Sequence, residues 1–312
     1  NSFEIMNIKK FGKGCIPTPY SIKETQYRLG AEAPHVIDWS KPYFVENGFS
    51  VNQRNQDGSS SCTAQATCYY TEALEKIENK KDEDYSARYN YSQSYIPPEG
   101  GAYIWKAMLI PQKPGLASSV SVPDGNSTEI EMRDGSLNLK ALIEARGDKY
   151  AQITNDKDMD HLAAITEDYH GFITGFNGYN KMFSYDGTVI DWSKSEWGHA
   201  VWVCGYVVRN GKKCLKFKNS WGSSWGDGGY GYFPEEFIKS GQMFDAYVYA
   251  VLEDLDPNSI MLTEKQVREL QALEGYKDEA GVAFWNGKLL SDYLAARLPD
   301  KVKTINEALN QQ

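Results

Sequence analysis

The sequence predicts an α+β fold in which a helical first half meets a second half of short antiparallel strands. Two observations lead to this expectation. Small and apolar residues recur at helical spacing directly after Cys62. From about residue 171 to 233, short β-favouring runs alternate with glycines and turn signals, as an antiparallel sheet or barrel requires. With 312 residues, the chain is long enough for one large domain or two modest ones.

The N-terminal stretch is expected to form an extended arm that crosses the surface of the main domain. Its segment GKGCIPTPYS is punctuated by Gly and Pro and has weak periodicity. We therefore assign residues 1–33 to this arm, residues 34–257 to the main domain and residues 258–312 to a C-terminal extension.

The first half of the main domain is expected to be mainly helical. A helix should run from Cys62 to about Lys80, because its apolar residues keep helical spacing and charged residues gather at its far end. The segment PPEGG at 97–101 predicts a sharp bend before a short helix over about 103–109. Residues 136–170 should supply one or two more helices.

The second half is expected to supply the strands. Four β-favouring runs stand between glycines and turn signals: GFITGF, AVWVCGYVV, CLKFKNS and YGYF. The extension at 258–312 then returns to helical periodicity, with Thr263 as N-cap and Gly275 as C-cap, and predicts a helical hairpin. These helices could dock the protein to a larger assembly, but packing on the main domain is favoured because short helices need tertiary contacts.

Composition argues against two classes of function. The net charge of −9 and the lack of a basic stripe with interleaved aromatic residues make nucleic-acid binding unexpected. No apolar run approaches the ~20 residues that a membrane-spanning helix needs. Peptides, proteins or small molecules are the expected partners.

Cys62 is the candidate nucleophile, although a cysteine inside a protein is most often a small buried hydrophobe. A cysteine attacks a carbonyl as thiolate, which requires a lowered pKa, a base and donors for the oxyanion that follows. A thiol at the first residue of a helix lies at the positive end of the helix dipole, which favours the thiolate. The small residues before Cys62 would let a substrate backbone approach.

Three further residues complete a possible catalytic set. His199 follows Gly198 and begins a strand, so its ring should be exposed at a sheet rim. Asn219 should lie on the neighbouring strand, where its amide could orient the ring of His199. Gln56 lies six residues before Cys62 and could place a side-chain N–H beside the Cys62 backbone N–H as an oxyanion hole.

With these motifs, residues 34–253 resemble the papain-like cysteine peptidase family. The matching segments are PHVIDWS at 34–40, Asn55-Gln56 through Cys62-Thr63-Ala64, HAVWVCGY at 199–206 and KNSWGSSWGDGGYGYF at 218–233. His199 and Asn219 follow Cys62 by 137 and 157 residues, near the interval of about 130–150 residues known for papain-like enzymes.

The resemblance implies a two-lobe fold, with a helical lobe led by the Cys62 helix and an antiparallel β-barrel-like lobe that carries His199 and Asn219. A peptide or protein substrate would bind extended in the cleft between them. The resemblance also assigns substrate contacts to Gly100, Gly101, Gly198 and Phe176, and gives Trp221 the role of covering the bond between Asn219 and His199. It implies neither a metal nor an organic cofactor.

The function expected from the resemblance is that of a cysteine endopeptidase, which cleaves peptide bonds through a Cys-His-Asn triad and a thioester acyl-enzyme. Two alternatives stay open. One is a catalytically silent binding or structural module, favoured by Thr63 where an aromatic residue usually follows the nucleophile. The other is a related amidase or acyl transferase with the same triad.

The cysteines differ from the family pattern. Ser59 replaces the usual cysteine three residues before the nucleophile, so the disulfide beside the active site is missing and a reducing, cytoplasmic setting is expected. Cys68 is expected in the core, and Cys204 and Cys214 as two buried thiols rather than a disulfide. In place of a long inhibitory pro-region stands the 1–33 arm with Cys15, which we hypothesise to lie in or near the cleft.

Overall fold

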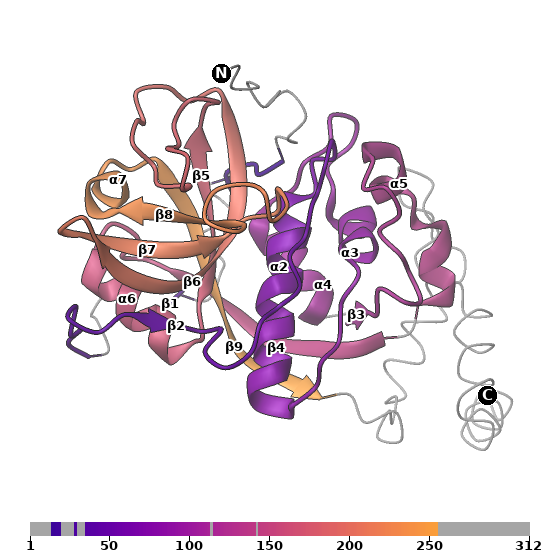
Figure 1. Cartoon of the computed structure of the whole chain (residues 1–312). Coiled ribbons are helices and arrows are strands. Elements are labelled where there is room, and N and C mark those ends of the chain that lie inside the picture. Colours follow the sequence, from indigo (N-terminus) through magenta and orange to yellow (C-terminus); the bar gives the residue numbers. More distant parts are fainter. Residues whose placement is uncertain (1–13, 20–27, 30–34, 113–114, 142, 255–312) are drawn as a thin grey trace, which may run out of the picture.

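The computed structural model describes residues 14–19, 28–29, 35–112, 115–141 and 143–254, which form two lobes side by side (Figure 1). One lobe is mainly helical and the other is built on a sheet, so the predicted α+β class with two lobes is confirmed. The extension at 258–312, with its expected helices, lies outside the described residues.

The helical lobe is built around α2 (Cys62–Leu74), which continues as the π-helix η2 (Glu75–Asn79). The expected helix from Cys62 to about Lys80 is thus confirmed, and the short helix after the PPEGG bend is α4. The other elements of this lobe are α3 (Ala87–Ser94), α4 (Ile104–Gln112), β3 (Leu116–Ala117), α5 (Glu129–Arg133) and the 3-10 helix η3 (Gly135–Lys140).

All residues of α2 are buried, because other elements cover the helix on every side. Tyr70 and Ala73 pack into a cluster with Trp202 of the strand-rich lobe. Ala64 and Cys68 pack into a second cluster within the helical lobe. The helix therefore joins the two lobes, and Cys68 is a core thiol as expected.

The strands belong to one nine-stranded sheet with the main order β1-β4-β9-β5-β6-β7-β8, to which β2 and β3 add at β6 and β4. The four predicted strand runs correspond to β5 (Phe172–Gly178), β6 (Trp197–Arg209), β7 (Lys212–Lys218) and β8 (Tyr230–Pro234). The remaining elements of this lobe are β1 (Arg28–Leu29), β2 (Tyr43–Phe44), β4 (Ile143–Ile153), β9 (Met243–Asp254), α6 (Met159–Asp168) and α7 (Glu235–Lys239).

Residues 136–170 supply the two helical elements that were expected, but they also contain a strand that was not predicted. The helical elements are η3 and α6 at the two ends of this range, and β4 lies between them. This strand pairs antiparallel with β9, from Ala145 opposite Asp254 to Gln152 opposite Tyr247. A partner about one hundred residues further along the chain supplies the backbone hydrogen bonds, so local periodicity could not reveal the strand.

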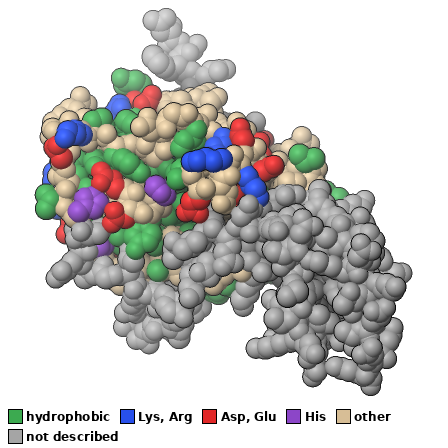
Figure 2. Space-filling view, turned by 90° about the horizontal axis from the view of Figure 1, so that it is seen from below, with side chains coloured by type: hydrophobic (Ala, Val, Ile, Leu, Met, Phe, Trp, Pro, Cys, Tyr) green, Lys and Arg blue, Asp and Glu red, His purple; other side chains and the backbone are tan. Residues whose placement is uncertain are grey.

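All five cysteines are free thiols, which agrees with the expectation for Cys204 and Cys214. Over the described part of the face in Figure 2, acidic and basic side chains are interspersed with hydrophobic ones. Among the helices in the described ranges, none has both the length and the apolar character needed to cross a membrane.

Candidate active site

Cys62 is the first residue of α2 and is fully buried. Burial raises the pKa of its thiol to about 12, although the backbone groups of Ala200, Thr63 and Gly14 near the sulfur oppose this shift. Ala200 directly follows His199 in β6, so its contact with the sulfur brings the nucleophile of the helical lobe to the strand that carries the candidate base.

His199 and Asn219 meet because β6 and β7 pair as an antiparallel hairpin. With Trp202 opposite Lys218, the residue after β7 lies alongside β6 near His199. Nε2 of His199 lies 2.8 Å from Oδ1 of Asn219, and that oxygen also accepts a hydrogen bond from the N–H of Ser220. The oxygen is therefore the acceptor, which puts the hydrogen on Nε2 and leaves Nδ1 as the basic nitrogen.

Aromatic rings enclose His199. Trp221 stacks on the imidazole with 4.6 Å between ring centroids, and Trp197 and Phe176 approach it edge-on. Burial in this aromatic surrounding lowers the pKa of His199 to about 4, while the hydrogen bond to Asn219 acts in the opposite direction. Cys62 and His199 are therefore a neutral thiol and a neutral imidazole in this state of the molecule.

Phe176 differs from its expected place. It was expected in a substrate pocket, but it is fully buried and packs against Phe217, Phe233 and Phe237 on the inner face of the strand-rich lobe. Its position in β5, opposite His199, makes it a support for the imidazole ring.

Gln56 lies close to the nucleophile, and hydrogen bonds to Ser59 and Ser220 hold both its side chain and its backbone in place. Its Nε2 donates to the carbonyl of Ser59 at 2.8 Å, its Oε1 accepts from the hydroxyl of Ser220 at 2.6 Å, and its backbone N–H donates to the carbonyl of Ser220. The side-chain amide of Gln56 is thus fixed between Ser59 and Ser220, close to the segment that leads into Cys62.

Two residues that support the site were missed by the sequence analysis. Ser220 binds both Asn219 and Gln56, and it directly follows Asn219 in the motif, which is the one signal that could have identified it. Nε2 of Gln53 donates to the carbonyl of Asn219 at 2.5 Å and to the hydroxyl of Tyr69 at 3.0 Å. Together they tie the candidate triad to the segment that precedes α2.

The predicted substrate-binding glycines divide into two groups. Gly101 and Gly198 line the space beside Cys62, where both lie against the backbone of residues 14–15. Gly100 instead faces the ion pair of Arg133 and Glu129. Ala102, which the sequence analysis did not single out, contributes its backbone N–H and carbonyl to the same groove.

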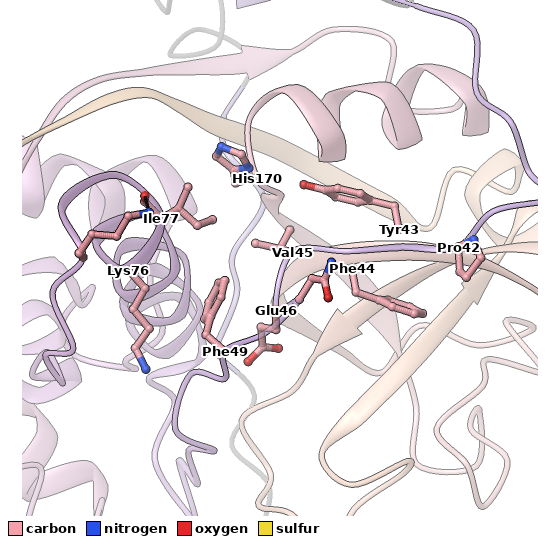
Figure 3. A pocket seen from close by; sticks show the side chains of 11 residues that line it. Pro42, Tyr43, Phe44, Val45, Glu46, Phe49, Lys76, Ile77 and His170 are labelled. Atoms are coloured by element: carbon pink, nitrogen blue, oxygen red, sulfur yellow. Dashed lines mark hydrogen bonds between the residues drawn. The ribbon is translucent and has the colours of Figure 1, made fainter.

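A separate hollow of about 550 Å³ lies between the 42–49 segment and the end of α2 with η2 (Figure 3). Its walls include Tyr43, Phe49, Lys76 and His170, and none of the predicted site residues. It is distinct from the place where Cys62 meets β6. Within the described ranges, no cluster of three or more His, Cys, Asp or Glu side chains is arranged to hold a metal ion.

Comparison with known proteins places these residues in a family. The model of the papain family of cysteine proteases matches residues 33–251. A cathepsin L-like proteinase of Phaedon cochleariae is 27% identical over 221 residues, which cover 69% of this chain and 64% of that protein. Cathepsin K of Mus musculus is 28% identical over 136 residues, which cover 42% of this chain and 40% of that protein. The chain thus spans less than two thirds of the length of these curated relatives.

Solved structures show the same fold. Xylellain, a cysteine protease from Xylella fastidiosa, has a TM-score of 0.63 at 21% identity, with 77% of this chain and 96% of that chain covered. Procathepsin L 3 of the Tenebrio molitor larval midgut has a TM-score of 0.60 at 17% identity, with 78% and 77% covered. Since the family model spans most of the chain, this protein belongs to the papain family of cysteine proteases.

Proposed function

We propose that the protein is a cysteine endopeptidase, which hydrolyses peptide bonds in peptide or protein substrates through Cys62, His199 and Asn219. The observation that supports this most directly is that the Cys62 sulfur lies against β6, the strand that carries His199. There the backbone of Ala200 lies close to the Cys62 sulfur, and the preceding residue, His199, is bound through Nε2 to Asn219.

The first half of the reaction forms an acyl-enzyme. Nδ1 of His199 takes the proton of the Cys62 thiol, and the sulfur attacks the carbonyl carbon of the scissile peptide bond. The Cys62 N–H and the Gln56 amide stabilise the oxyanion of the tetrahedral intermediate. When this intermediate collapses, the C–N bond breaks, His199 gives its proton to the leaving amine, and a thioester remains on Cys62.

The second half releases the acid product. His199 takes a proton from a water molecule as the water oxygen attacks the thioester carbonyl, and the C–S bond breaks when the second tetrahedral intermediate collapses. The proton returns to the sulfur and restores the resting thiol. Throughout, Asn219 holds the imidazole in one tautomer, and Trp221 keeps water from the hydrogen bond between Asn219 and His199.

The test is labelling with an epoxide-type peptide inhibitor that reacts with activated thiols, followed by mass mapping of the modified cysteine. Modification of Cys62 alone is expected in the wild-type chain, with loss of labelling in His199→Ala. Cys68→Ala is the matched control, because Cys68 lies on the same helix in the core, and it should label like the wild type.

Two other outcomes would favour the alternative functions. Slow labelling that is spread over several cysteines and does not respond to His199→Ala would contradict the peptidase proposal and favour a binding module. Rapid labelling of Cys62, combined with hydrolysis of simple amides or acyl transfer to added amines but no peptide cleavage, would identify an amidase or acyl transferase. The setting that we propose is reducing, because all five cysteines are free thiols.

A further inference from the structure

The side-chain hydroxyl of Tyr69 joins α2 to the segment before it and to the backbone of Asn219. Its O–H donates a hydrogen bond to the carbonyl of Asn219 at 3.1 Å. The same oxygen accepts hydrogen bonds from the backbone N–H of Arg54 at 2.6 Å and from Nε2 of Gln53 at 3.0 Å. Three hydrogen bonds from three parts of the chain therefore meet at one oxygen.

The chemistry of the partners fixes the direction of these bonds. A phenol hydroxyl has one hydrogen to donate and can accept two. The nitrogens of Arg54 and Gln53 can only donate here, so the hydrogen of Tyr69 points to the carbonyl of Asn219. Tyr69 is fully buried, and burial raises the pKa of its phenol, so this hydrogen stays in place at neutral pH.

Tyr69 shares one face of α2 with the candidate nucleophile. It follows Cys62 by seven residues, which is close to two helical turns or about 10 Å along the axis. Both residues pack into the same cluster as Ala200 and Trp202 of β6, at the boundary between the lobes where α2 lies in Figure 1. A shift of α2 against the strand-rich lobe would therefore break the bond between Tyr69 and Asn219.

The backbone of Asn219 is held from both lobes. Its N–H donates to the carbonyl of Gly229 at 2.9 Å, within the strand-rich lobe. Its carbonyl accepts from Tyr69 of the helical lobe and from Nε2 of Gln53. Since the side chain of Asn219 binds Nε2 of His199, the position of its backbone relative to α2 also sets the position of the imidazole.

The neighbouring Tyr70 has the same chemistry with a different partner. It is also fully buried and stacks on Trp202 as Tyr69 does. Its hydroxyl donates to the backbone carbonyl of Tyr169 at 2.6 Å. Loss of either hydroxyl would remove a buried hydrogen bond, but only the hydroxyl of Tyr69 binds Asn219.

We propose that Tyr69 is a positioning residue, whose hydroxyl fixes Asn219, and through it the imidazole of His199, relative to Cys62. The effect on peptide cleavage rests on the proposed function, whereas the position of the imidazole does not. A misplacement of ~1 Å in an active site can cost about 100-fold in rate. Asn219 keeps its other hydrogen bonds without this hydroxyl, so the expected loss in kcat is smaller, about 10-fold.

The test compares the full-length wild type with Tyr69→Phe and with Tyr70→Phe as the matched control. Each variant removes one buried hydroxyl from α2 and keeps the ring. The position of the imidazole is followed by NMR through the Nε2–H signal of His199 in protein labelled with ¹⁵N-histidine, and the signal is assigned by its absence from His199→Ala. Initial rates of fluorescein-labelled casein hydrolysis at several concentrations give kcat and KM.

Tyr69→Phe should change both measurements, and Tyr70→Phe neither. The Nε2–H signal should be sharp in the wild type and in Tyr70→Phe, where the bond to Asn219 protects it from exchange, and broadened or shifted upfield in Tyr69→Phe. For Tyr69→Phe, kcat should fall about 10-fold with KM nearly unchanged, whereas Tyr70→Phe should stay within about 2-fold of the wild type. Both variants should unfold at a lower urea concentration than the wild type, since each loses a buried hydrogen bond.

A double variant separates positioning from a general structural effect. If Tyr69 acts through the side chain of Asn219, Tyr69→Phe should have no further effect once that side chain is absent. The kcat of Tyr69→Phe combined with Asn219→Ala should therefore equal that of Asn219→Ala within about 2-fold. A further 10-fold loss would show that Tyr69 acts elsewhere and would overturn the proposal.

The remaining outcomes separate the positioning role from the proposed function. A changed Nε2–H signal in Tyr69→Phe, in a protein that does not cleave casein, would support the positioning role and contradict the peptidase. Casein hydrolysis with equal kcat and equal Nε2–H signals in both tyrosine variants would support the peptidase and show the positioning role to be wrong. If Tyr69→Phe does not fold, Gln53→Met removes the second donor to the carbonyl of Asn219 and should change the Nε2–H signal in the same way.

Discussion

The buried imidazole of His199 should make the stability of the protein depend on pH in a predictable way. Its pKa is about 4 in the folded protein, against about 6.5 in an unfolded chain. Between these values the unfolded chain binds a proton that the folded protein excludes. The contribution of the neutral imidazole is therefore complete above pH 6.5, is lost progressively as the pH falls toward 4, and changes no further below that.

The difference between the pKa of His199 in the folded protein and in the unfolded chain sets how much free energy of unfolding is lost. Each pKa unit corresponds to about 1.4 kcal/mol, so the full effect below pH 4 is about 3 kcal/mol, of which about 2 kcal/mol should be lost between pH 8 and pH 5. His199→Phe removes the titrating group and keeps an aromatic ring in an aromatic surrounding. Oδ1 of Asn219 keeps its hydrogen bond from the Ser220 N–H in this variant.

The assay is urea unfolding at pH 8, 6.5 and 5, followed by tryptophan fluorescence and far-UV circular dichroism. The free energy of unfolding of the wild type, relative to that of His199→Phe, should fall by about 2 kcal/mol over this range. Cys68→Ala is the control: burial keeps the Cys68 thiol protonated throughout, so its difference from the wild type should not change with pH. A pH-independent difference for His199→Phe would refute the reasoning.

Three further predictions concern residues around the candidate triad and α2. Asn219→Ala should lower kcat/KM by roughly 100-fold on a peptide substrate, because the imidazole loses its orienting partner, and unchanged kinetics would exclude that role. It should also destabilise the protein by about 1–3 kcal/mol, since the buried donors of His199 and Ser220 lose their acceptor. Trp221→Ala should destabilise the protein by about 3–5 kcal/mol in urea unfolding, since a large ring leaves a buried position against His199. Glu72→Ala should cost up to about 3–5 kcal/mol, because the buried Arg54 loses its closest carboxylate and keeps only the longer ion pair with Asp124, at 3.4 Å. The exposed pair of Lys212 and Glu236 should contribute less than about 1 kcal/mol by the same measurement.

The sequence predicted the candidate site best where residues close to one another in the sequence determine the geometry. Cys62 begins a helix that the spacing of the apolar residues directly after it predicts. His199 lies in β6 and Asn219 directly follows β7, and a short turn after Arg209 joins these two strands, so a hairpin brings the two residues together. The strand β4 was missed because its partner β9 lies far along the chain.

The substrate-contacting residues were harder to predict for a different reason. Nearly every residue of β5 is buried, so alternation along the strand did not show which face Phe176 occupies. Gly100 and Gly101 are adjacent in sequence, yet Gly101 faces the backbone of Gly14 whereas Gly100 faces the side chains of Arg133 and Glu129, which come from a distant part of the chain. The close approach of Gly14 to Cys62 depends on a contact between distant segments that no local pattern encodes.

The burial of α2 on all sides has a consequence for how the protein opens. A helix that packs into the clusters of both lobes cannot fray without exposing both, so its amide hydrogens should exchange with solvent only through global unfolding. The nucleophile then has no route to solvent through local unfolding of the helix that carries it. Chemical modification of Cys62 in the folded protein therefore requires movement of the segments that cover the thiol, and thermal inactivation should coincide with loss of the entire fold.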